Sequence, residues 1–436
     1  MNKINEVHIA LLGMGNVGTG TLKILDMNKD KIFRKTNTEI NVKKVFVKNI
    51  DKRREFSLPG NVITSDIDEI LNDPDIDILV ELMGGLEPAY SYIKRALQSG
   101  KSVVTANKAL IATYGQELTS LALANGVAIK YEASVAGGIP IINILSSSLA
   151  GNEFSEITGI INGTTNYILT KMTENHMEYA QALTDAQALG FAEADPSSDI
   201  LGVDVAFKLS ILAREGFDFQ ISPQVIPTEG INNISKDDIE YASEFGYKIK
   251  LLAAIRKYDN NIECHVGPTL IPASHPLSSV SNEYNALLIK GNAISDMMVY
   301  GKGAGAMPTG SAVVGDIIDI LVNSCPNGIN ETSYNDLHSL PTFNFIGEGS
   351  SMYYLNFIVE DLPGVLGRIS TCFGDYGISI DSVIQRSSSI RSDGFVSVVY
   401  ILHECFRETI NKATVEMSSY DFIHEIRSPI RVSPLK

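Results

Sequence analysis

The sequence predicts an α/β protein: a Rossmann-type, doubly wound parallel sheet, an inserted α+β domain, and a C-terminal ferredoxin-like βαββαβ domain. Three observations predict this fold class. The segment GMGNVG, residues 13–18, lies between a short apolar run and a helix-like stretch. Apolar runs then alternate with helical stretches as far as residue 132, which is typical of a parallel sheet covered on both faces. From residue 353 the pattern restarts in the order strand, helix, strand, strand, helix, strand.

The first domain is expected to comprise residues 1–135 together with 300–325. Its strands follow from short apolar runs at 7–12, 42–47, 76–81, 102–105 and 127–132, with helices at 88–99 and 115–125. A glycine-rich loop followed by an apolar-periodic helix, over 300–321, is expected to return to this sheet and complete it.

The middle domain, residues 136–299, is expected to bind substrate and to dimerise. A strand at 153–161 precedes helices that begin at NGTTNYILTKM and EYAQALTDAQALG, and one long helix is expected over 199–214. Strands at 249–255, 263–270 and 285–290 suggest antiparallel pairing.

The last domain is expected over residues 350–436, after a linker over 326–349 that is rich in Pro, Asn, Ser and Gly. Its predicted strands are 353–360, 378–387, 394–402 and 422–430, and its predicted helices are 365–376 and 407–418.

Composition excludes several classes of partner. Lys and Arg total 35 against 51 Asp and Glu, and the resulting charge of −16 repels a phosphate backbone, so neither nucleic acid nor an anionic membrane is an expected partner. The four cysteines are far apart and form no CxxC pair, which argues against a disulfide scaffold or a thiolate zinc site. No leader pattern and no run of about 20 apolar residues occurs. A cytoplasmic protein is expected.

The glycine turn predicts a dinucleotide site. Gly13, Gly15 and Gly18 allow, in order, a tight turn, close approach to a pyrophosphate, and helix packing, while the helix start at Asn16 and Val17 offers free N–H groups. The second strand ends near Lys48, with Lys52, Arg53 and Arg54 close behind; cations there suit a 2′-phosphate, although they also fit a solvated loop. NADP is favoured and NAD stays open.

One helix combines an acid and a base. Asp204 and Lys208 are four residues apart and share a face among apolar neighbours. Burial lowers a lysine pKa and a nearby carboxylate raises it, a balance that suits an ammonium donating a proton to a nascent alkoxide. The alternative is an ordinary surface ion pair. For Glu193 and Asp199, which precede this helix, the alternative is compensation of the helix dipole.

Two further residues lie at strand ends. Lys108 follows the strand at 102–105, where the carboxyl ends of parallel strands form the ligand crevice, although a loop lysine is often only solvated. Glu132 ends a strand before a glycine pair, where carbonyl oxygens and its carboxylate suit a hard cation; buried capping is the alternative.

The motifs GMGNVG, VVTANKALIA, YEASVAGGIPII, GIINGTTNYIL and FAEADPSSDILGVDVAFKLSILA occur in this order, and residues 5–325 closely resemble homoserine dehydrogenase. EDLPGVLGRIS resembles an ACT domain. The resemblance implies NAD(P)-dependent reduction of L-aspartate 4-semialdehyde to L-homoserine, on the branch towards threonine, isoleucine and methionine. Because the chain starts at the first Rossmann strand, the monofunctional form without a fused aspartate kinase is expected.

The resemblance also implies residue roles. Lys208 matches the proton donor, Asp204 its carboxylate neighbour, Lys108 a second active-site lysine, and Glu193 and Asp199 carboxylates near the substrate ammonium. The resemblance further implies a structural Na⁺ site. It also implies that Lys108 and two other residues contact the cofactor. The implied Na⁺ ligands are the carboxylate of Glu132 and the carbonyls of Val135, Gly137 and Ile139; the further cofactor positions are Thr105 and Gly310.

Two points concern specificity and regulation. Many family members have arginine where this chain has Lys48, and lysine binds phosphate only as a point charge. The ACT resemblance implies a threonine effector near Gly364, with a dimerisation module as the alternative; both favour a homodimer or homotetramer. Rival functions are another ACT-bearing dehydrogenase, such as one for a 2-hydroxy acid, and a cofactor-binding sensor without catalysis.

Overall fold

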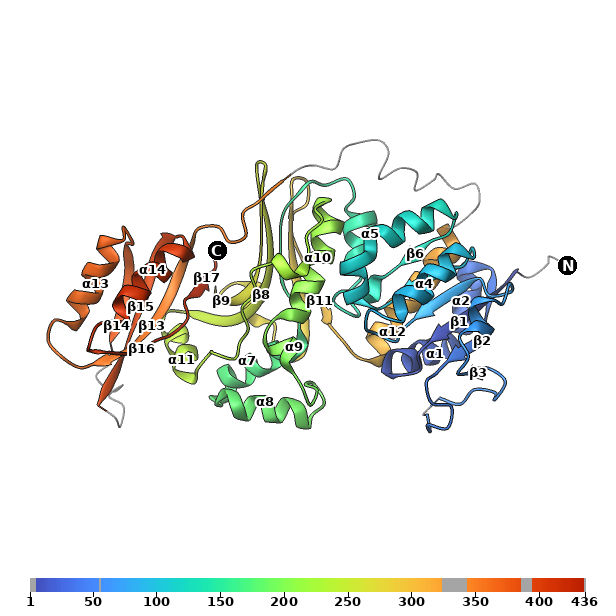
Figure 1. Cartoon of the computed structure of the whole chain (residues 1–436), viewed down its shortest axis with the longest axis horizontal. Coiled ribbons are helices and arrows are strands. Elements are labelled where there is room, and N and C mark those ends of the chain that lie inside the picture. The colour runs from blue at the N-terminus through green and yellow to red at the C-terminus, as the bar shows by residue number, and fades with distance from the viewer. Residues whose placement is uncertain (1–4, 55, 324–342, 386–393, 435–436) are drawn as a thin grey trace.

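The computed structural model describes residues 5–54, 56–323, 343–385 and 394–434. Figure 1 shows an elongated molecule in which the N-terminal α/β part and the C-terminal βαββαβ part lie at opposite ends of a middle part. Within the described residues, no helix is both long and apolar enough to cross a bilayer. The predicted linker, 326–349, falls largely outside the described residues.

The N-terminal part contains a six-stranded sheet, the Rossmann sheet, in the order β3-β2-β1-β4-β5-β6 with all pairs parallel. The strands are β1 (Asn5–Leu12), β2 (Thr38–Phe46), β3 (Ile63–Thr64), β4 (Ile78–Glu81), β5 (Ser102–Thr105) and β6 (Ile129–Lys130). β4 is buried at every position because helices cover both faces of a central parallel strand. The strand order reverses between β1 and β4, and ligands bind at such a point in open α/β sheets.

Helices α1 and α12 approach each other at backbone distance. A Cβ added to Gly20 would lie 2.0 Å from the carbonyl oxygen of Ala306, so only glycine fits at this crossing. The segment after residue 300 therefore lies against the Rossmann sheet. The helices of this part are α1 (Asn16–Met27), α2 (Lys29–Thr36), α3 (Asp68–Leu71), α4 (Ala89–Gln98), α5 (Lys108–Ala124) and α12 (Ala306–Asn323).

The middle part is a layer of antiparallel strands on which helices α7, α10 and α11 pack. Its strands are β7 (Phe154–Ile160), β8 (Tyr247–Tyr258), β9 (Asn261–Pro272), β10 (Tyr284–Gly291) and β11 (Ser295–Lys302). Its helices and short turns are η1 (Glu132–Ser134), α6 (Ile141–Asn143), η2 (Ile144–Ser148), α7 (Gly163–Asn175), α8 (Tyr179–Ala188), α9 (Ser197–Ile200), α10 (Val203–Phe217), η3 (Pro223–Val225), α11 (Lys236–Glu244) and η4 (Pro276–Ser279).

The C-terminal unit has the predicted βαββαβ order, with its strands arranged β16-β13-β15-β14. Its core holds aromatic rings in edge contact, among them Phe357, Phe373 and Tyr400. The elements are β13 (Ser351–Glu360), α13 (Val365–Asp375), β14 (Ile380–Gln385), β15 (Phe395–Cys405), α14 (Arg407–Met417) and β16 (Ile423–Ile426), and β12 (Asn344–Phe345) precedes them.

The prediction of one last strand over 422–430 is wrong in detail. The chain forms β16 and then a separate strand, β17 (Ile430–Val432), which runs antiparallel to β13 and parallel to β9. β17 thereby joins the sheets of the middle part and the C-terminal unit into one 11-stranded sheet. Three residues at a chain end carry too little pattern to predict this pairing.

Two helix predictions are also corrected. The long helix expected over 199–214 is broken into α9 and α10 at Gly202, which has a φ of +81°. The helix expected from residue 115 begins at Lys108, because Asn107 caps it by accepting the N–H of Leu110 at 3.2 Å.

Candidate active site

The glycine turn at the carboxyl end of β1 leaves room for a ligand beside α1. A Cβ at Gly18 would lie 2.4 Å from the carbonyl oxygen of Gly13, so this glycine lets the turn pack closely, whereas nothing lies within 4 Å of a Cβ at Gly15. Helix α1 has no side-chain cap, so its first N–H groups, at Asn16 and Val17, suit an anion. The five predicted residues of the turn therefore lie together and fit a pyrophosphate.

A buried polar chain fixes the start of α5. Glu81, at the end of β4, accepts the hydroxyl of Thr105 at 2.6 Å, and the Thr105 oxygen accepts the N–H of Asn107 at 3.0 Å. Both Glu81 and Thr105 are fully buried. The Thr105 side chain is thus engaged inside the protein, and the chain sets the position of Lys108, the first residue of α5. Glu81 and Asn107 were not predicted; an acid ending an otherwise apolar strand was the available signal.

Asp204 is the centre of the polar cluster on α10. Its carboxylate lies 2.6 Å from the Nζ of Lys208 and 2.8 Å from the Nζ of Lys108. The side chains of Asp204 and Lys208 are only 6% and 12% exposed. The alternative of a surface ion pair is therefore excluded. The contact with Lys108 joins the carboxyl edge of the Rossmann sheet to the middle part.

The two ammonium groups control the charge of Asp204. Burial alone would raise the pKa of this carboxyl, but the charges and hydrogen bonds of Lys208 and Lys108 outweigh burial and hold its pKa well below the usual range. In return, Asp204 raises the pKa of Lys108, against the effect of burial and with smaller contributions from Asp199 and Glu193. Asp204 is therefore an anion and Lys108 a cation at neutral pH.

The ammonium of Lys208 is oriented by two acceptors. Besides Asp204, it donates to the carbonyl oxygen of Ile161, at the end of β7, at 2.8 Å. A lysine ammonium has three donors, so within the described residues one N–H remains for a ligand.

Asn162 ties the carboxylates of α9 and α10 together. Its Nδ2 donates to Asp199 at 2.8 Å and to Asp204 at 2.9 Å, and its side chain is turned that way because its Oδ1 caps α7 by accepting the N–H of Thr165 at 2.9 Å. The hydroxyl of Thr164 lies 3.0 Å from the other oxygen of Asp199 and 2.7 Å from the carbonyl oxygen of Phe191, and these two acceptors share its single hydrogen. Neither Asn162 nor Thr164 was predicted, although Asn before Gly-Thr-Thr is a helix-cap signal.

Glu193 lies at the margin of this cluster. It is exposed in the loop before α9, and its carboxylate acts on Lys108 through charge. The structure thus brings together Lys108, Asp199, Asp204 and Lys208, with Glu193 nearby.

The predicted cation site contains two buried carboxyl groups. Both oxygens of Glu132 accept backbone N–H groups, from Ile142 and Asn143, each at 2.8 Å, and the Glu132 N–H donates to Asp316 at 2.9 Å. Burial raises the pKa of Glu132 to about 7 and that of Asp316 to about 8. A cavity of about 360 Å³ adjoins both. The Glu132 carboxylate therefore caps the backbone at Ile142 and Asn143, as the alternative interpretation predicts. Each of its oxygens accepts one hydrogen bond, so lone pairs remain for a cation.

The backbone beside Glu132 turns sharply. Ala136 and Gly137 both have positive φ, and a Cβ at Gly137 would lie 2.4 Å from the carbonyl oxygen of Gly303. Of the predicted carbonyl ligands, that of Ile139 already accepts the N–H of Ile141 at 2.8 Å. Within the described residues, no three acidic, histidine or cysteine side chains gather as a metal-binding group. Any cation here depends mainly on backbone oxygens, such as those of Val135 and Gly137.

The remaining predicted cofactor residues lie on either side of the glycine turn. Lys48 is exposed just beyond the end of β2, and the N–H of Gly13 donates to Phe46, the last residue of that strand, at 3.0 Å. Gly310, on α12, is packed against α1, because its Cβ would lie 2.7 Å from the backbone nitrogen of Thr21. In this structure Gly310 is a helix-packing position, and its contact with a cofactor stays a prediction.

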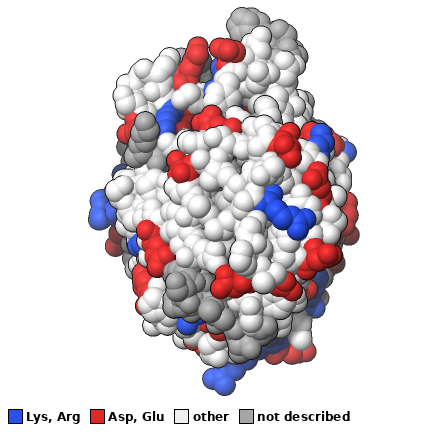
Figure 2. Space-filling view, turned by 90° about the vertical axis from the view of Figure 1, so that its left-hand side faces the viewer, with Lys and Arg blue, Asp and Glu red and all other residues white. Residues whose placement is uncertain are grey.

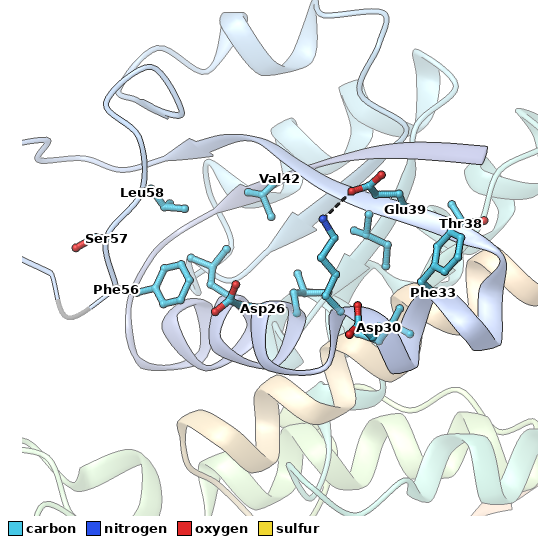
Figure 3. A pocket seen from close by; sticks show the side chains of 14 residues that line it. Asp26, Asp30, Phe33, Thr38, Glu39, Val42, Phe56, Ser57 and Leu58 are labelled. Carbon is cyan, nitrogen blue, oxygen red and sulfur yellow. Dashed lines mark hydrogen bonds and ion pairs between the residues drawn. The ribbon is translucent and has the colours of Figure 1, made fainter. Parts of the chain in front are cut away.

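A second cavity, of about 470 Å³, lies away from these residues. It is formed by α1, α2, β2 and residues 56–58, and the ion pair of Lys29 and Glu39 at 2.6 Å crosses it (Figure 3). None of the predicted site residues lines it, and its lining is mainly aliphatic and aromatic. The candidate active site is therefore the Asp204 cluster and the glycine turn.

Comparison with known proteins gives a consistent family. The family model described as "Homoserine dehydrogenase" matches residues 140–318, "Homoserine dehydrogenase, NAD binding domain" matches 13–132, and "ACT domain" matches 353–408. The homoserine dehydrogenase of Bacillus subtilis is 37% identical and that of Synechocystis 42% identical, each over 98% of this chain and 99% of the relative.

Solved structures agree. A homoserine dehydrogenase from Thiobacillus denitrificans aligns with a TM-score of 0.89 at 38% identity, over 99% of each chain. A hyperthermophilic archaeal homoserine dehydrogenase in complex with NADPH aligns with a TM-score of 0.60 at 28% identity, over 72% of this chain and 97% of that one.

Proposed function

The chain belongs to the homoserine dehydrogenase family, and we propose that its reaction is carried out at the Asp204 cluster, with Lys208 as the proton donor. The enzyme is an NAD(P)-dependent oxidoreductase that interconverts L-aspartate 4-semialdehyde and L-homoserine. The observation that carries the assignment of Lys208 is its shielded ammonium, held by Asp204 and Ile161 with one N–H left over.

The nicotinamide cofactor, when bound, supplies or accepts the hydride. Lys208 donates its free N–H to the aldehyde oxygen and gives up that proton as the oxygen becomes a hydroxyl. Asp204 then remains paired with Lys108, so the transfer leaves one cation beside the buried carboxylate instead of two. Because Asp204 pairs with two ammonium groups, Lys208 can give up its proton without leaving the buried carboxylate unpaired.

The substrate ammonium is assigned to the acidic side of the cluster. Asp199 and Glu193 supply negative charge beside Lys108. One oxygen of Asp199 accepts the amide of Asn162, and the other accepts only the hydroxyl hydrogen that Thr164 shares with Phe191, which leaves lone pairs for a ligand. Asn162 and Thr164 are positioning residues, because they fix the direction of Asp199.

The cofactor is assigned to the glycine turn, with NADP preferred over NAD. Open space at Gly15 and the uncapped start of α1 fit the pyrophosphate. Lys48 is exposed beyond β2, where a 2′-phosphate would meet it. Arg54 is engaged by the backbone carbonyls of Asn49, Ile50 and Lys52. Of the exposed cations of this loop, we assign Lys48 to the phosphate because it lies nearest in the chain to the end of β2.

A structural Na⁺ is assigned beside Glu132, held by this carboxylate and by the carbonyls of Val135, Gly137 and Ile139. The support is chemical: two carboxyl groups, Glu132 and Asp316, are buried together with raised pKa values, and a monovalent cation beside them would favour their ionised forms.

The ACT domain is assigned to threonine control and to self-association into a homodimer or homotetramer. Gly364 has a φ of +92° and starts α13 without a side-chain cap, and nothing lies within 4 Å of a Cβ there, which leaves backbone N–H groups for an amino-acid carboxylate. Figure 2 shows that this end of the molecule presents a broad area without charged side chains. Leu362, Phe406 and Val415 are exposed apolar residues of the C-terminal unit. The cytoplasmic location stays a prediction from the cysteine pattern.

The full chain can be assayed directly for these assignments. We expect the chain to oxidise L-homoserine with NADP⁺ as the hydride acceptor, and the absorbance of the reduced nicotinamide measures the rate. The kcat/KM for NAD⁺ is expected to be smaller than that for NADP⁺. No reduction of either cofactor in the presence of L-homoserine would contradict the proposed function.

A further inference from the structure

A partly buried ion pair joins the C-terminal unit to a loop of the middle part. Arg407, the first residue of α14, lies 2.7 Å from Glu229, and the two side chains are 24% and 26% exposed. Neither residue belongs to the motifs of the active site.

The loop that carries Glu229 is held on its other sides by backbone bonds. The Glu229 N–H donates to Val266 on β9 at 2.9 Å, and the N–H of Ile231 donates to Ile200, the last residue of α9, at 2.8 Å. The loop is therefore hydrogen-bonded to β9 on one side and to the end of α9 on the other.

The same loop covers the joint between α9 and α10. A Cβ at Gly230 would lie 2.2 Å from the carbonyl oxygen of Ile200, and a Cβ at Gly202 would lie 3.0 Å from Thr228 and 3.4 Å from the carbonyl oxygen of Glu229. At Gly230 the loop meets the backbone of α9 directly, and at Gly202 it packs through the methyl group of Thr228 and the carbonyl of Glu229. Because this packing is close, a shift of the loop is passed to the joint.

The joint sets the relative position of two active-site carboxylates. Asp199 is on α9 and Asp204 on α10, and both accept hydrogen bonds from the single amide of Asn162. We propose that Arg407 and Glu229 are positioning residues for the reaction, through which the ACT domain braces the joint and so holds Asp199 for the substrate ammonium. This inference rests on the proposed function of the Asp204 cluster.

The ACT domain has other anchors, so loss of this pair does not detach it. β17 pairs with β9, and Asp238 on α11 accepts the hydroxyl of Tyr354 and the amide of Asn356, both from β13 and both at 2.9 Å. Variants of Arg407 can therefore be studied in the folded full chain.

The test is steady-state kinetics of the full chain with Arg407→Ala, Arg407→Glu and the charge-swapped double variant Glu229→Arg/Arg407→Glu. Arg407→Ala is expected to raise the KM for homoserine about twofold to fivefold, the effect open to a partly exposed pair, with kcat and the cofactor KM nearly unchanged. Arg407→Glu places like charges together and is expected to raise it further. The double variant should return the KM to within about twofold of the parent.

A matched control is Lys412→Ala, on the same helix, whose pair with Glu408 at 2.7 Å is 62% and 80% exposed. It should leave every parameter unchanged. Unaltered homoserine KM in Arg407→Glu, an equal rise in the cofactor KM, or failure of the double variant to recover would each overturn the inference. A parent enzyme without homoserine activity would instead overturn the proposed function, which separates the two failures.

Discussion

Replacing Lys208 with alanine is the sharpest test of the catalytic assignment. The variant lacks the ammonium that donates to the substrate oxygen, and a lost general acid typically lowers turnover about 10²-fold to 10⁴-fold. This corresponds to about 2.7 to 5.4 kcal/mol in the activation free energy. The structure predicts a smaller effect on folding, because Asp204 keeps its ion pair with Lys108 at 2.8 Å. Asp204 loses its 2.6 Å contact with Lys208 but keeps the amide of Asn162 as well, whereas the carbonyl of Ile161 loses the donor Lys208, at a cost of about 1–3 kcal/mol.

The assay is initial-rate oxidation of L-homoserine at saturating cofactor, with cofactor affinity measured separately by fluorescence titration and stability by thermal unfolding. We expect kcat to fall, cofactor affinity to stay within about twofold, and small primary amines in the buffer to restore part of the rate. Lys236→Ala is the matched control. Lys236 forms an i,i+4 pair with Glu240 at 4.0 Å, with side chains 35% and 37% exposed. It is an ordinary surface pair with the same spacing as the buried pair of Lys208, so its loss should leave turnover unchanged.

Two results would refute this reasoning. Turnover of Lys208→Ala within about fivefold of the parent would remove the proton-donor role, since general acids contribute more than this. A fall in turnover matched by loss of cofactor binding and of thermal stability would assign Lys208 to structure instead of chemistry.

Four further predictions follow from other parts of the molecule. Asn162→Ala should lower kcat/KM for homoserine about tenfold to hundredfold in steady-state assays, because it removes hydrogen bonds to two carboxylates, whereas unchanged values would contradict its positioning role. Burial raises the pKa of Glu132 to about 7 and of Asp316 to about 8, so the folded chain retains protons that the unfolded chain releases. Their contribution to the free energy of unfolding should therefore be complete below their unfolded pKa values near 4 and be lost as the pH rises to about 8. In denaturant titrations, Asp316→Asn should make the free energy of unfolding fall less over this pH range. Binding of Na⁺ would make NaCl reduce the same fall more than choline chloride does. Lys48→Ala should raise the KM for NADP⁺ more than that for NAD⁺, and equal effects would exclude a 2′-phosphate contact. Gly364→Ala, strained at a φ of +92°, should weaken inhibition by threonine without changing uninhibited activity; inhibition curves identical to the parent's would exclude control at this turn.

Sequence patterns predicted the fold class because its signals are local. The turn at Gly13 to Gly18 follows an apolar strand and precedes a helix, and the pair of Asp204 and Lys208 follows from helix periodicity. Both features depend on residues within one element or two adjacent ones. The structure has them as predicted.

The missed features depend on contacts between distant segments. Asn162 is 37 residues from Asp199 and 42 from Asp204, so its bridging role follows only from how β7, α9 and α10 meet. The break at Gly202 was hidden because residues 199–214 keep a helical apolar period across it. The break occurs at a glycine with positive φ, against which the loop of Thr228 and Glu229 packs, and no local signal except the glycine itself indicates it.

The pairing of β17 with β9 bears on how the enzyme can be engineered. A regulatory module on a tether can be deleted or exchanged, but here removal of the C-terminal unit would strip a neighbour from β9 and leave an open edge on which chains could stack. The two parts should also melt as one calorimetric unit, with the amides of β17 among the slowest to exchange with deuterium. Grafting a different sensor onto this scaffold would have to keep Ile430–Val432 in register with β9.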